Sequence, residues 1–388
     1  MTGSKVCIIQ YNASRFLTRV DRSARALAEA GCEVVLIAIK DDETPSYEER
    51  NGYTVRRVEL KSRRLPRKYG LRILRFIEAI WRTFVAAWRE DADIYNPRDA
   101  EPLLVAHAAA ALRRAKVVYD SDELNLDQNA PWARKRWWRF AMKRFEGFFA
   151  RRSAAVITSD NGRADIIAER YGIARPAVVR NVPDDIAELD PDEGFRAAAL
   201  GNGRYLLIYQ GVYDPNRGLP ELIDAMRELP ECRLAFVGYG QMEDELKQRV
   251  RRAGLEDRIR FFDAVPFDVM MRYTAAADIG VFPLVGSCLS YVYAAPNKLF
   301  EFMLSGLPVV VSDLPEMAAV VRAESVGELI ADPEDPHSIA SAVRALIEGP
   351  EPLEAIGARA REAARARHHW GIDREVLLDV YRTIGAIT

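Results

Sequence analysis

Cysteine and histidine are both scarce in this sequence of 388 residues. The four cysteines lie far apart and include no C-x-x-C pair, which excludes a disulfide framework and a structural zinc site of the usual spacing. They favour a reducing compartment. Histidine also occurs only four times, so a histidine base has little support. The residues concerned are Cys7, Cys32, Cys232, Cys288, His107, His337, His368 and His369.

The sequence also lacks an apolar run of about 20 residues, the length that a transmembrane helix needs. Its first apolar stretch, Lys5–Ile9, is too short for the core of a secretory signal peptide. We therefore expect a cytoplasmic protein, with peripheral attachment to the inner face of the plasma membrane as a further expectation. The composition, 49% hydrophobic and 29% charged, is that of an ordinary globular protein with room for two domains.

The formal net charge of −2 hides two basic segments. Residues 61–90 carry nine Lys and Arg against two Glu, and residues 131–152 carry eight against one. The remainder of the chain is correspondingly acidic. Basic segments confined to two places indicate a localised anionic partner.

The link after the first predicted strand, residues 11–14, lacks the three-glycine fingerprint of nicotinamide dinucleotide-binding domains. Short apolar runs nevertheless alternate with helical periodicity, which predicts α/β architecture with parallel sheets. Residues 185–203 are polar and rich in Asp and Gly, so they read as a linker between two domains. Strands are predicted near 5–10, 33–39, 53–60, 94–96, 116–120, 154–159, 177–180, 205–210, 233–237, 258–262, 279–282, 307–311 and 326–330.

The stretch Ser290–Pro315 combines a possible anion site, a carboxylate and a buried strand. Pro296 suits the first turn of a helix, where free backbone amides and Lys298 together favour a phosphate or pyrophosphate. Glu301 leans back toward the same helix start, and ribose hydroxyls are natural partners for its carboxylate. The alternative is an ordinary helix start with a capping Glu. Leu307–Val311 then predicts a strand buried on both faces.

The segment PNKLFEFMLSGLPVVVSDLPE resembles the nucleotide-sugar signature of the family-four retaining glycosyltransferases, in the subgroup whose motif reads P-N-K-x-F-E. The resemblance extends over nearly the whole chain. It implies the GT-B fold, an α/β architecture in which two Rossmann-like domains face each other across a cleft. The implied parts are an acceptor-binding domain at 1–184, a linker at 185–203, a nucleotide-sugar-binding domain at 204–369 and a C-terminal helix at 370–388 that crosses back to the first domain.

The resemblance also implies a reaction. A hexosyl group moves, with retention of configuration, from a UDP- or GDP-type sugar to a hydroxyl of a lipid-linked or cell-surface glycan or of a secondary-metabolite precursor. The leaving phosphate accepts the proton of the acceptor. No metal and no cofactor is expected besides the substrate nucleotide sugar.

Roles in the family carry over to the matching residues of this sequence. Arg217 and Lys298 are the cations that meet the diphosphate and are catalytic candidates, and Glu301 binds the ribose. Tyr293 stands where the family usually has a first Glu, and Val212 stands where it has a further cation. The other implied binders of the nucleotide sugar are Gly211, Gly238, Gly240, Ser290, Tyr291, Pro296, Asn297 and Leu299.

The segment Asp120-Ser121-Asp122-Glu123 follows a predicted strand, and the carboxyl ends of parallel strands face the ligand crevice. It resembles the D-S-H-E segment of many family members, with Asp122 in place of the histidine. Asp122 and Glu123 are therefore further catalytic candidates. The D-x-D strings at 91–93 and 120–122 are not expected to bind metal.

Residues 131–152 predict a helix that interleaves aromatic with basic side chains, a composition typical of helices on anionic membranes. Nucleic acid binding is an alternative that we do not expect, and a domain core with a solvated basic face is another. A second amphipathic helix is predicted at 71–90. Arg15 and Arg19 face either the cleft or solvent. Candidate acceptor or membrane contacts are Arg15, Arg19, Trp132, Arg134, Lys135, Arg136, Trp137 and Trp138.

Two rival functions share this pattern. A non-hydrolysing nucleotide-sugar 2-epimerase has the same fold, but the scarcity of histidine argues against it. A catalytically dead nucleotide-sugar-binding protein is favoured by Tyr293 and Asp122, whereas the joint presence of Arg217, Lys298 and Glu301 argues for an enzyme.

Overall fold

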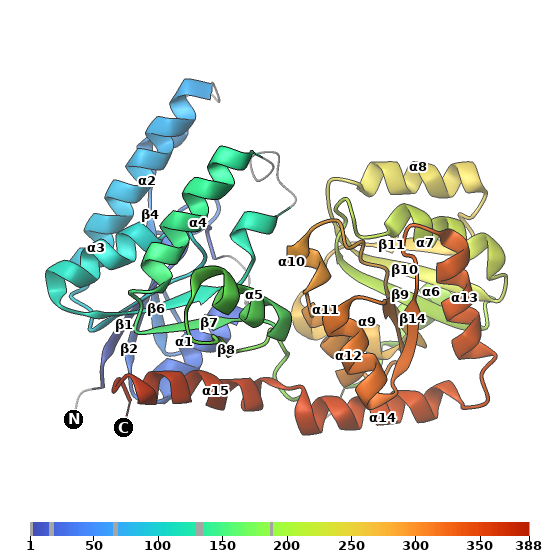
Figure 1. The fold of residues 1–388 in the computed structure, drawn as a ribbon. Coiled ribbons are helices and arrows are strands. Elements are labelled where there is room, and N and C mark those ends of the chain that lie inside the picture. The colour runs from blue at the N-terminus through green and yellow to red at the C-terminus, as the bar shows by residue number, and fades with distance from the viewer. Residues whose placement is uncertain (1–2, 15–18, 65–68, 129–134, 187–188, 388) are drawn as a thin grey trace. The chain divides into compact units, whose positions relative to one another are not determined.

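The computed structural model describes residues 3–14, 19–64, 69–128, 135–186 and 189–387, without the side chains of residues 63, 64 and 69–72. The chain divides into two compact units, Met1–Arg180 with Asp373–Thr388, and Asn181–Ile372. Figure 1 shows that each unit is built from a sheet with helices on both sides. The expectation of two α/β domains with parallel sheets is therefore confirmed.

The first unit has an eight-stranded sheet in the order β3-β4-β2-β1-β5-β6-β7-β8. All pairs are parallel except β3 with β4. The strands are β1 (Lys5–Ile9), β2 (Glu33–Ile39), β3 (Tyr47–Arg50), β4 (Tyr53–Val58), β5 (Ile94–Pro97), β6 (Lys116–Ser121), β7 (Ala155–Thr158) and β8 (Ala177–Val178).

The helices of the first unit include the last helix of the chain from Asp373 onward. Its Asp373 carboxylate accepts a hydrogen bond from the Arg180 backbone amide (2.6 Å) and pairs with the Arg180 guanidinium. The helices are α1 (Arg19–Glu29), α2 (Tyr69–Arg89), α3 (Leu103–Arg113), α4 (Arg136–Ala150), α5 (Asn161–Tyr171) and α15 (Trp370–Thr383), with short 3-10 turns η1 (Lys61–Arg64) and η2 (Asn125–Asp127).

The second unit has a six-stranded parallel sheet in the order β11-β10-β9-β12-β13-β14. Its strands are β9 (Tyr205–Val212), β10 (Cys232–Tyr239), β11 (Ile259–Phe262), β12 (Ile279–Phe282), β13 (Val309–Ser312) and β14 (Gly327–Ile330). Its helices are α6 (Glu193–Leu200), α7 (Leu219–Ala225), α8 (Glu243–Ala253), α9 (Phe267–Ala275), α10 (Leu289–Val292), α11 (Asn297–Leu304), α12 (Pro315–Glu324), α13 (Pro336–Ile347) and α14 (Leu353–Arg367), with the 3-10 turn η4 (Met226–Glu228).

The segment 185–203, expected as a linker, contains helix α6 of the second unit. The Asp192 side chain caps the helix by accepting from the Phe195 amide (2.8 Å). Phe195 and Ala199 lie four residues apart on one helical face, and both are buried in the core, with the Phe195 ring stacked on Tyr273. The polar composition of the segment concealed this short apolar stripe.

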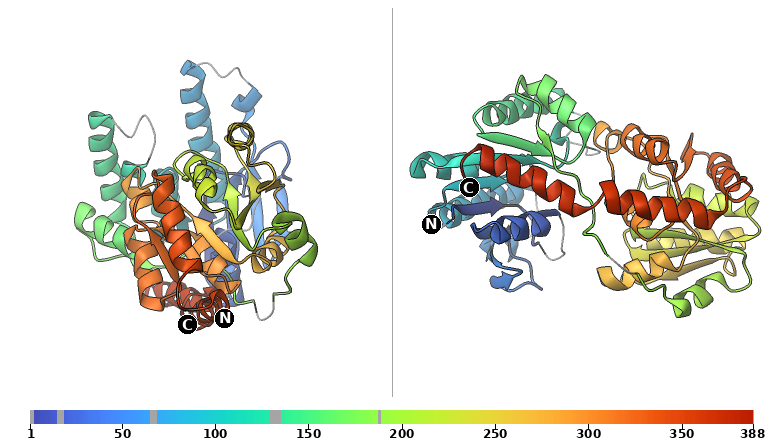
Figure 2. Two further views of the ribbon diagram at one scale, coloured as in Figure 1. Left: turned by 90° about the vertical axis from the view of Figure 1, so that its right-hand side faces the viewer. Right: turned by 90° about the horizontal axis from the view of Figure 1, so that it is seen from below.

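Among the parallel strands of each sheet the chain order reverses at one place, between β1 and β5 in the first unit and between β9 and β12 in the second. Open parallel sheets bind ligands outside the carboxyl ends of their strands at such a switch point. Figure 2 shows the helices that cover each sheet from two further directions. The two candidate regions of chemistry are therefore the loops after β1 and β5, with that of the neighbouring strand β6, and the loops after β9 and β12.

Candidate active site

Helix α11 begins close to the switch point of the second unit, between β12 and β13 in the chain. Its N-cap is Pro296, which was predicted in the first turn, so the helix begins one residue later, at Asn297. Proline has no side-chain group with which to cap the amides that follow. The first turn contains Lys298 and no acidic residue. Free amides, the positive end of the helix dipole and an ammonium group thus gather at one point, which suits a phosphate.

Glu301 is buried one turn along α11, with only 4% of its surface exposed. Its Oε2 accepts a hydrogen bond from Gln210 Nε2 (2.5 Å) and its Oε1 accepts one from Asn297 Nδ2 (2.7 Å). The Oε1 of Gln210 in turn accepts from the Thr274 hydroxyl (2.5 Å). The Glu301 carboxylate is therefore fixed on both sides, by one amide donor on each oxygen.

Lys298 and Arg217 converge on one aromatic ring at the end of β12. The Lys298 Nζ lies 5.2 Å from the centroid of the Phe282 ring, and the Arg217 Cζ lies 5.8 Å from the same centroid. The Arg217 guanidinium also lies over Tyr291. Burial lowers the pKa of Lys298 to about 8; the Glu301 carboxylate opposes this shift, and the positive charge of Arg217 adds to it. Two cations held this close favour an anion that both can contact.

Two glycines at the strand ends leave room for this arrangement. A Cβ on Gly211 would lie 2.5 Å from Lys298 Cε and 2.8 Å from Nζ, and Gly211 has a φ of +114°. A Cβ on Gly238 would lie 2.0 Å from the Gly211 carbonyl oxygen. Side chains at either position would displace the lysine or separate β9 from β10. Gly240 follows directly after β10.

The other predicted binders of the nucleotide sugar have mixed positions. Cys288 is the N-cap of the short helix α10, which carries Ser290, buried, and Tyr291, half-buried beneath Arg217. Tyr293 is the C-cap of the same helix. The Leu299 side chain is fully buried in the core, and its amide donates to the Pro296 carbonyl (3.0 Å). Leu299 therefore packs the helix on the core, and its role toward the nucleotide sugar stays a prediction.

At the switch point of the first unit, two arginines hold two aspartates. Arg19 Nη1 lies 2.9 Å from Asp120 Oδ1 and 3.0 Å from Asp122 Oδ1, and Arg98 makes two further contacts of 2.8 and 2.7 Å with the other oxygens of the same carboxylates. Burial alone would raise the pKa of Asp122, but the charges of Arg19 and Arg98 lower it. The string 120–122 is thus an ion-pair network with arginine.

Asp99 lies beside this network, and its pKa is shifted in the opposite direction from that of Asp122. Its Oδ1 accepts from the amides of Asp122 (3.0 Å) and Glu123 (3.2 Å). Burial raises the pKa of Asp99, and the nearby charge of Asp122 acts in the same direction. Neighbouring carboxyl groups with pKa values moved in opposite directions are a feature of reaction sites.

Arg19 was expected at a cleft or a surface, but only 1% of its side chain is exposed, so it cannot contact a membrane. Glu123 is exposed and its carboxylate accepts from Gln128 Nε2 (2.9 Å). The sequence analysis did not predict Arg98, because it follows a predicted strand without any motif around it. It did not predict Gln210, because that residue ends a strand that is otherwise apolar. An isolated polar residue at the carboxyl end of a buried strand was the available signal in both cases.

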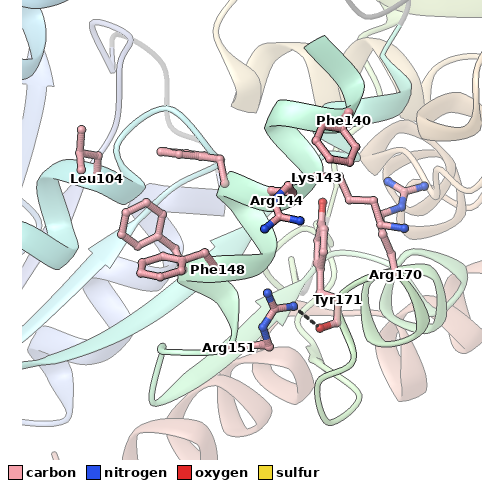
Figure 3. A pocket seen from close by; sticks show the side chains of 10 residues that line it. Leu104, Phe140, Lys143, Arg144, Phe148, Arg151, Arg170 and Tyr171 are labelled. Carbon is pink, nitrogen blue, oxygen red and sulfur yellow. Dashed lines mark hydrogen bonds between the residues drawn. The ribbon is translucent and has the colours of Figure 1, made fainter. Parts of the chain in front are cut away.

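Helix α4 presents part of the predicted basic and aromatic surface. Lys135, Arg136 and Trp137 are exposed and Trp138 is half-buried. Arg15, Trp132 and Arg134 lie outside the described residues. Beside α4 is a groove of about 780 Å³, in which the Arg144 guanidinium lies over the Phe140 ring (5.6 Å) and Arg151 donates to the Tyr171 carbonyl (Figure 3). No helix in the described part of the chain is long and apolar enough to cross a bilayer.

Two family models match the chain. One described as "Glycosyl transferases group 1" matches residues 204–349, and one described as "Glycosyl transferase 4-like domain" matches residues 17–183. A curated relative, D-inositol 3-phosphate glycosyltransferase of Kineococcus radiotolerans, is 30% identical over 251 residues, which cover 58% of this chain and 56% of that protein. The chain spans about half the length of the curated relatives that it matches.

Solved structures agree with this result. Sucrose-phosphate synthase from Thermosynechococcus elongatus superposes with a TM-score of 0.80 at 18% identity, covering 99% of both chains. HepE from Anabaena in complex with UDP-glucose superposes with a TM-score of 0.74 at 16% identity, covering 99% of this chain and 100% of that one. With its two matched domains and this shared fold, the chain belongs to the group 1 glycosyltransferases of the GT-B fold.

Proposed function

We propose that the protein is a retaining hexosyltransferase that uses a UDP- or GDP-type sugar and a hydroxyl acceptor. The observation that carries this proposal is the convergence of Lys298 and Arg217 on Phe282 beside the uncapped start of α11. A diphosphate bound there meets two cations and several free amides. Glu301, held by Gln210 and Asn297, receives the ribose hydroxyls.

The same groups promote departure of the nucleotide. As the bond between the anomeric carbon and the diphosphate oxygen breaks, negative charge grows on that oxygen, where Lys298 and Arg217 stabilise it. The acceptor oxygen forms the new bond to the anomeric carbon on the same face. Its proton passes to the leaving phosphate, so the nucleoside diphosphate departs with that proton. These cations supply the charge that a divalent metal supplies in other glycosyltransferases.

The acceptor belongs, in this proposal, to a lipid-linked or cell-surface glycan. Support comes from helix α4, whose exposed Arg136 and Trp137 suit an anionic membrane surface on which such an acceptor resides. Peripheral attachment to the inner face of the plasma membrane follows from the same reasoning. A secondary-metabolite precursor is the alternative acceptor.

The test begins with thermal stabilisation by a panel of UDP and GDP sugars, because a ligand of the folded state raises the apparent stability by mass action. The stabilising sugar is then assayed with hydroxyl acceptors in excess chelator, and the anomeric configuration of the product is read by NMR. Transfer with retention supports the proposal. Loss of transfer that magnesium or manganese restores, or an inverted product, overturns the mechanism.

One observation favours a binding protein without catalysis as a second candidate. Asp122 replaces the family's histidine, and both of its oxygens are engaged by arginines. Stabilisation by a nucleotide sugar, combined with neither transfer nor hydrolysis nor epimerisation of that sugar, would establish this alternative.

A further inference from the structure

Helix α2 presents six of its large apolar side chains to solvent, whereas Ile80 and Phe84 pack against the core beside its small buried residues. Ala79, Thr83 and Ala87, spaced by four residues, are buried where α2 packs on α3 and the sheet. Ile73, Ile77 and Trp81, also spaced by four, are 63%, 55% and 63% exposed. Residues four apart share one face of a helix. The predicted apolar face of residues 71–90 therefore exists, but it points outward.

The outward apolar surface continues on the neighbouring helices. Among the described residues, eleven of the seventeen exposed large hydrophobic side chains lie on α2, α3 and α4. On α4, Trp137 and Phe140 are 69% and 65% exposed. Figures 1 and 2 show α2 and α4 projecting from the first unit in the same direction, with their N-terminal ends outermost. An apolar surface of this extent marks an interaction site.

The charge of these helices is positive and their acidic groups are occupied. Glu78 accepts from the amides of Lys61 and Ser62 (2.8 Å each), and Glu146 is buried against the Tyr119 hydroxyl (2.6 Å). Neither α2 nor α4 has an acidic residue in its first turn. Lys143 and Arg144 are exposed, and no carboxylate lies within ion-pair distance of either in the described part of the chain. The outer ends of both helices thus attract anions.

The groove of Figure 3 combines both properties on a smaller scale. Its lining combines aromatic rings of α4 with Lys143 and Arg144 of the same helix, and Leu104 of α3 adds an apolar group. Rings beside cations suit an amphiphile whose phosphate meets the cations and whose chain lies on the rings.

We propose that α2 and α4 insert together into the interfacial layer of an anionic bilayer, with α2 supplying apolar contact and α4 supplying charge. This proposal extends the proposed function, in which the acceptor lies in a membrane, and it rests on that function only for its biological purpose. A flat, negatively charged surface reaches both helix ends at once, because they project in the same direction. The absence of free acidic groups on α2 and α4 matches anionic lipid headgroups across the whole surface.

The test is flotation of the full-length protein with vesicles of phosphatidylglycerol and phosphatidylcholine, against pure phosphatidylcholine, at about 0.05 M and about 0.5 M salt. The apolar variant is Ile73→Ser with Ile77→Ser and Trp81→Ser; the charge variant is Lys143→Gln with Arg144→Gln. The matched controls, in the second unit, are Phe267→Ser and Arg251→Gln with Arg252→Gln, all at exposed positions.

Wild type should bind anionic vesicles at low salt and keep a fraction of that binding at high salt. The charge variant should lose roughly thirtyfold of the low-salt affinity, because two cations leave the surface. The apolar variant should lose at least about tenfold, and should lose the salt-resistant fraction completely. The controls should behave as wild type.

Several outcomes overturn the proposal. They are failure of wild type to float, equal binding to neutral vesicles, or high-salt binding of the apolar variant equal to that of wild type. A shift of wild type to twice its mass in sedimentation, abolished in the apolar variant, would assign the α2 face to a second copy of the chain. Thermal unfolding of each variant separates loss of binding from loss of folding, and nucleotide-sugar stabilisation tests the proposed function independently.

Discussion

The Gln210 amide donates a 2.5 Å hydrogen bond to Oε2 of Glu301, joining the end of β9 to the buried face of α11. Both side chains are almost completely buried, and Thr274 fixes the orientation of the Gln210 amide. The position of Glu301, the proposed binder of the ribose, therefore depends on Gln210, a residue that need not touch the nucleotide.

Replacing Gln210 by Leu should weaken binding of the nucleoside diphosphate by about ten- to a hundredfold. The change leaves one oxygen of a buried carboxylate without its donor, at a cost of about 1–3 kcal/mol. Calorimetry with UDP and GDP measures the affinity, and thermal unfolding measures the stability. Thr274→Val should also weaken binding of the nucleoside diphosphate, but by less. An unchanged affinity in Gln210→Leu would show that Glu301 does not need this support.

Glu301→Ala and Lys298→Ala should each reduce affinity for the nucleotide sugar by about ten- to a hundredfold. Each removes one charge-assisted hydrogen bond to the ligand, worth about 1.5–3 kcal/mol. The two should differ in selectivity: only Lys298→Ala should weaken binding of inorganic pyrophosphate, because Glu301 is assigned to the ribose. Equal loss of pyrophosphate binding in both variants would contradict the assignment.

Affinity for the nucleoside diphosphate should fall as the pH rises through about 8. Burial lowers the pKa of Lys298 to about 8, so the free protein carries the positive charge below that pH and loses it above. Above that pH the amine has to take up a proton from solvent when the diphosphate binds, and this proton uptake lowers the affinity. Calorimetry across this range in buffers of different ionisation enthalpy measures both affinity and proton uptake. Lys298→Arg should abolish the dependence, since arginine stays charged.

Asp120→Ala should destabilise the first unit more than Asp122→Ala. The Asp120 side chain is 1% exposed and that of Asp122 is 31% exposed, yet both bind Arg19 and Arg98. Removing the fully buried partner leaves two arginines poorly compensated, at about 3–5 kcal/mol, whereas water can replace part of what Asp122 provides. Urea unfolding gives both values. Equal losses of the free energy of unfolding would mean that water reaches the network at Asp120 as easily as at Asp122.

The α11 unit was predictable because Pro296, Lys298 and Glu301 are local: helix start, charge and carboxylate lie within six residues. Gln210 and Arg98 showed only a polar residue at a strand end, because their partners are brought close by folding. Gln210 of β9 meets Glu301 of helix α11, and Arg98, after β5, meets Asp120 of β6. The outward face of α2 was also beyond the sequence, since amphipathicity gives a stripe but not the side of the helix that the sheet takes. On α2 the small residues Ala79, Thr83 and Ala87 allow close packing, and large ones such as Ile77 and Trp81 remain outside.

The position of Cys288 at the start of α10 makes it a natural point of attachment for a probe. Cys7, Cys32 and Cys232 are buried, whereas Cys288 is half-exposed, three residues before Tyr291 and its overlying Arg217. Thiol-directed fluorophores should therefore modify the unaltered chain at one place. Occupancy of the neighbouring phosphate site should then be visible as a change in emission, without any engineered cysteine.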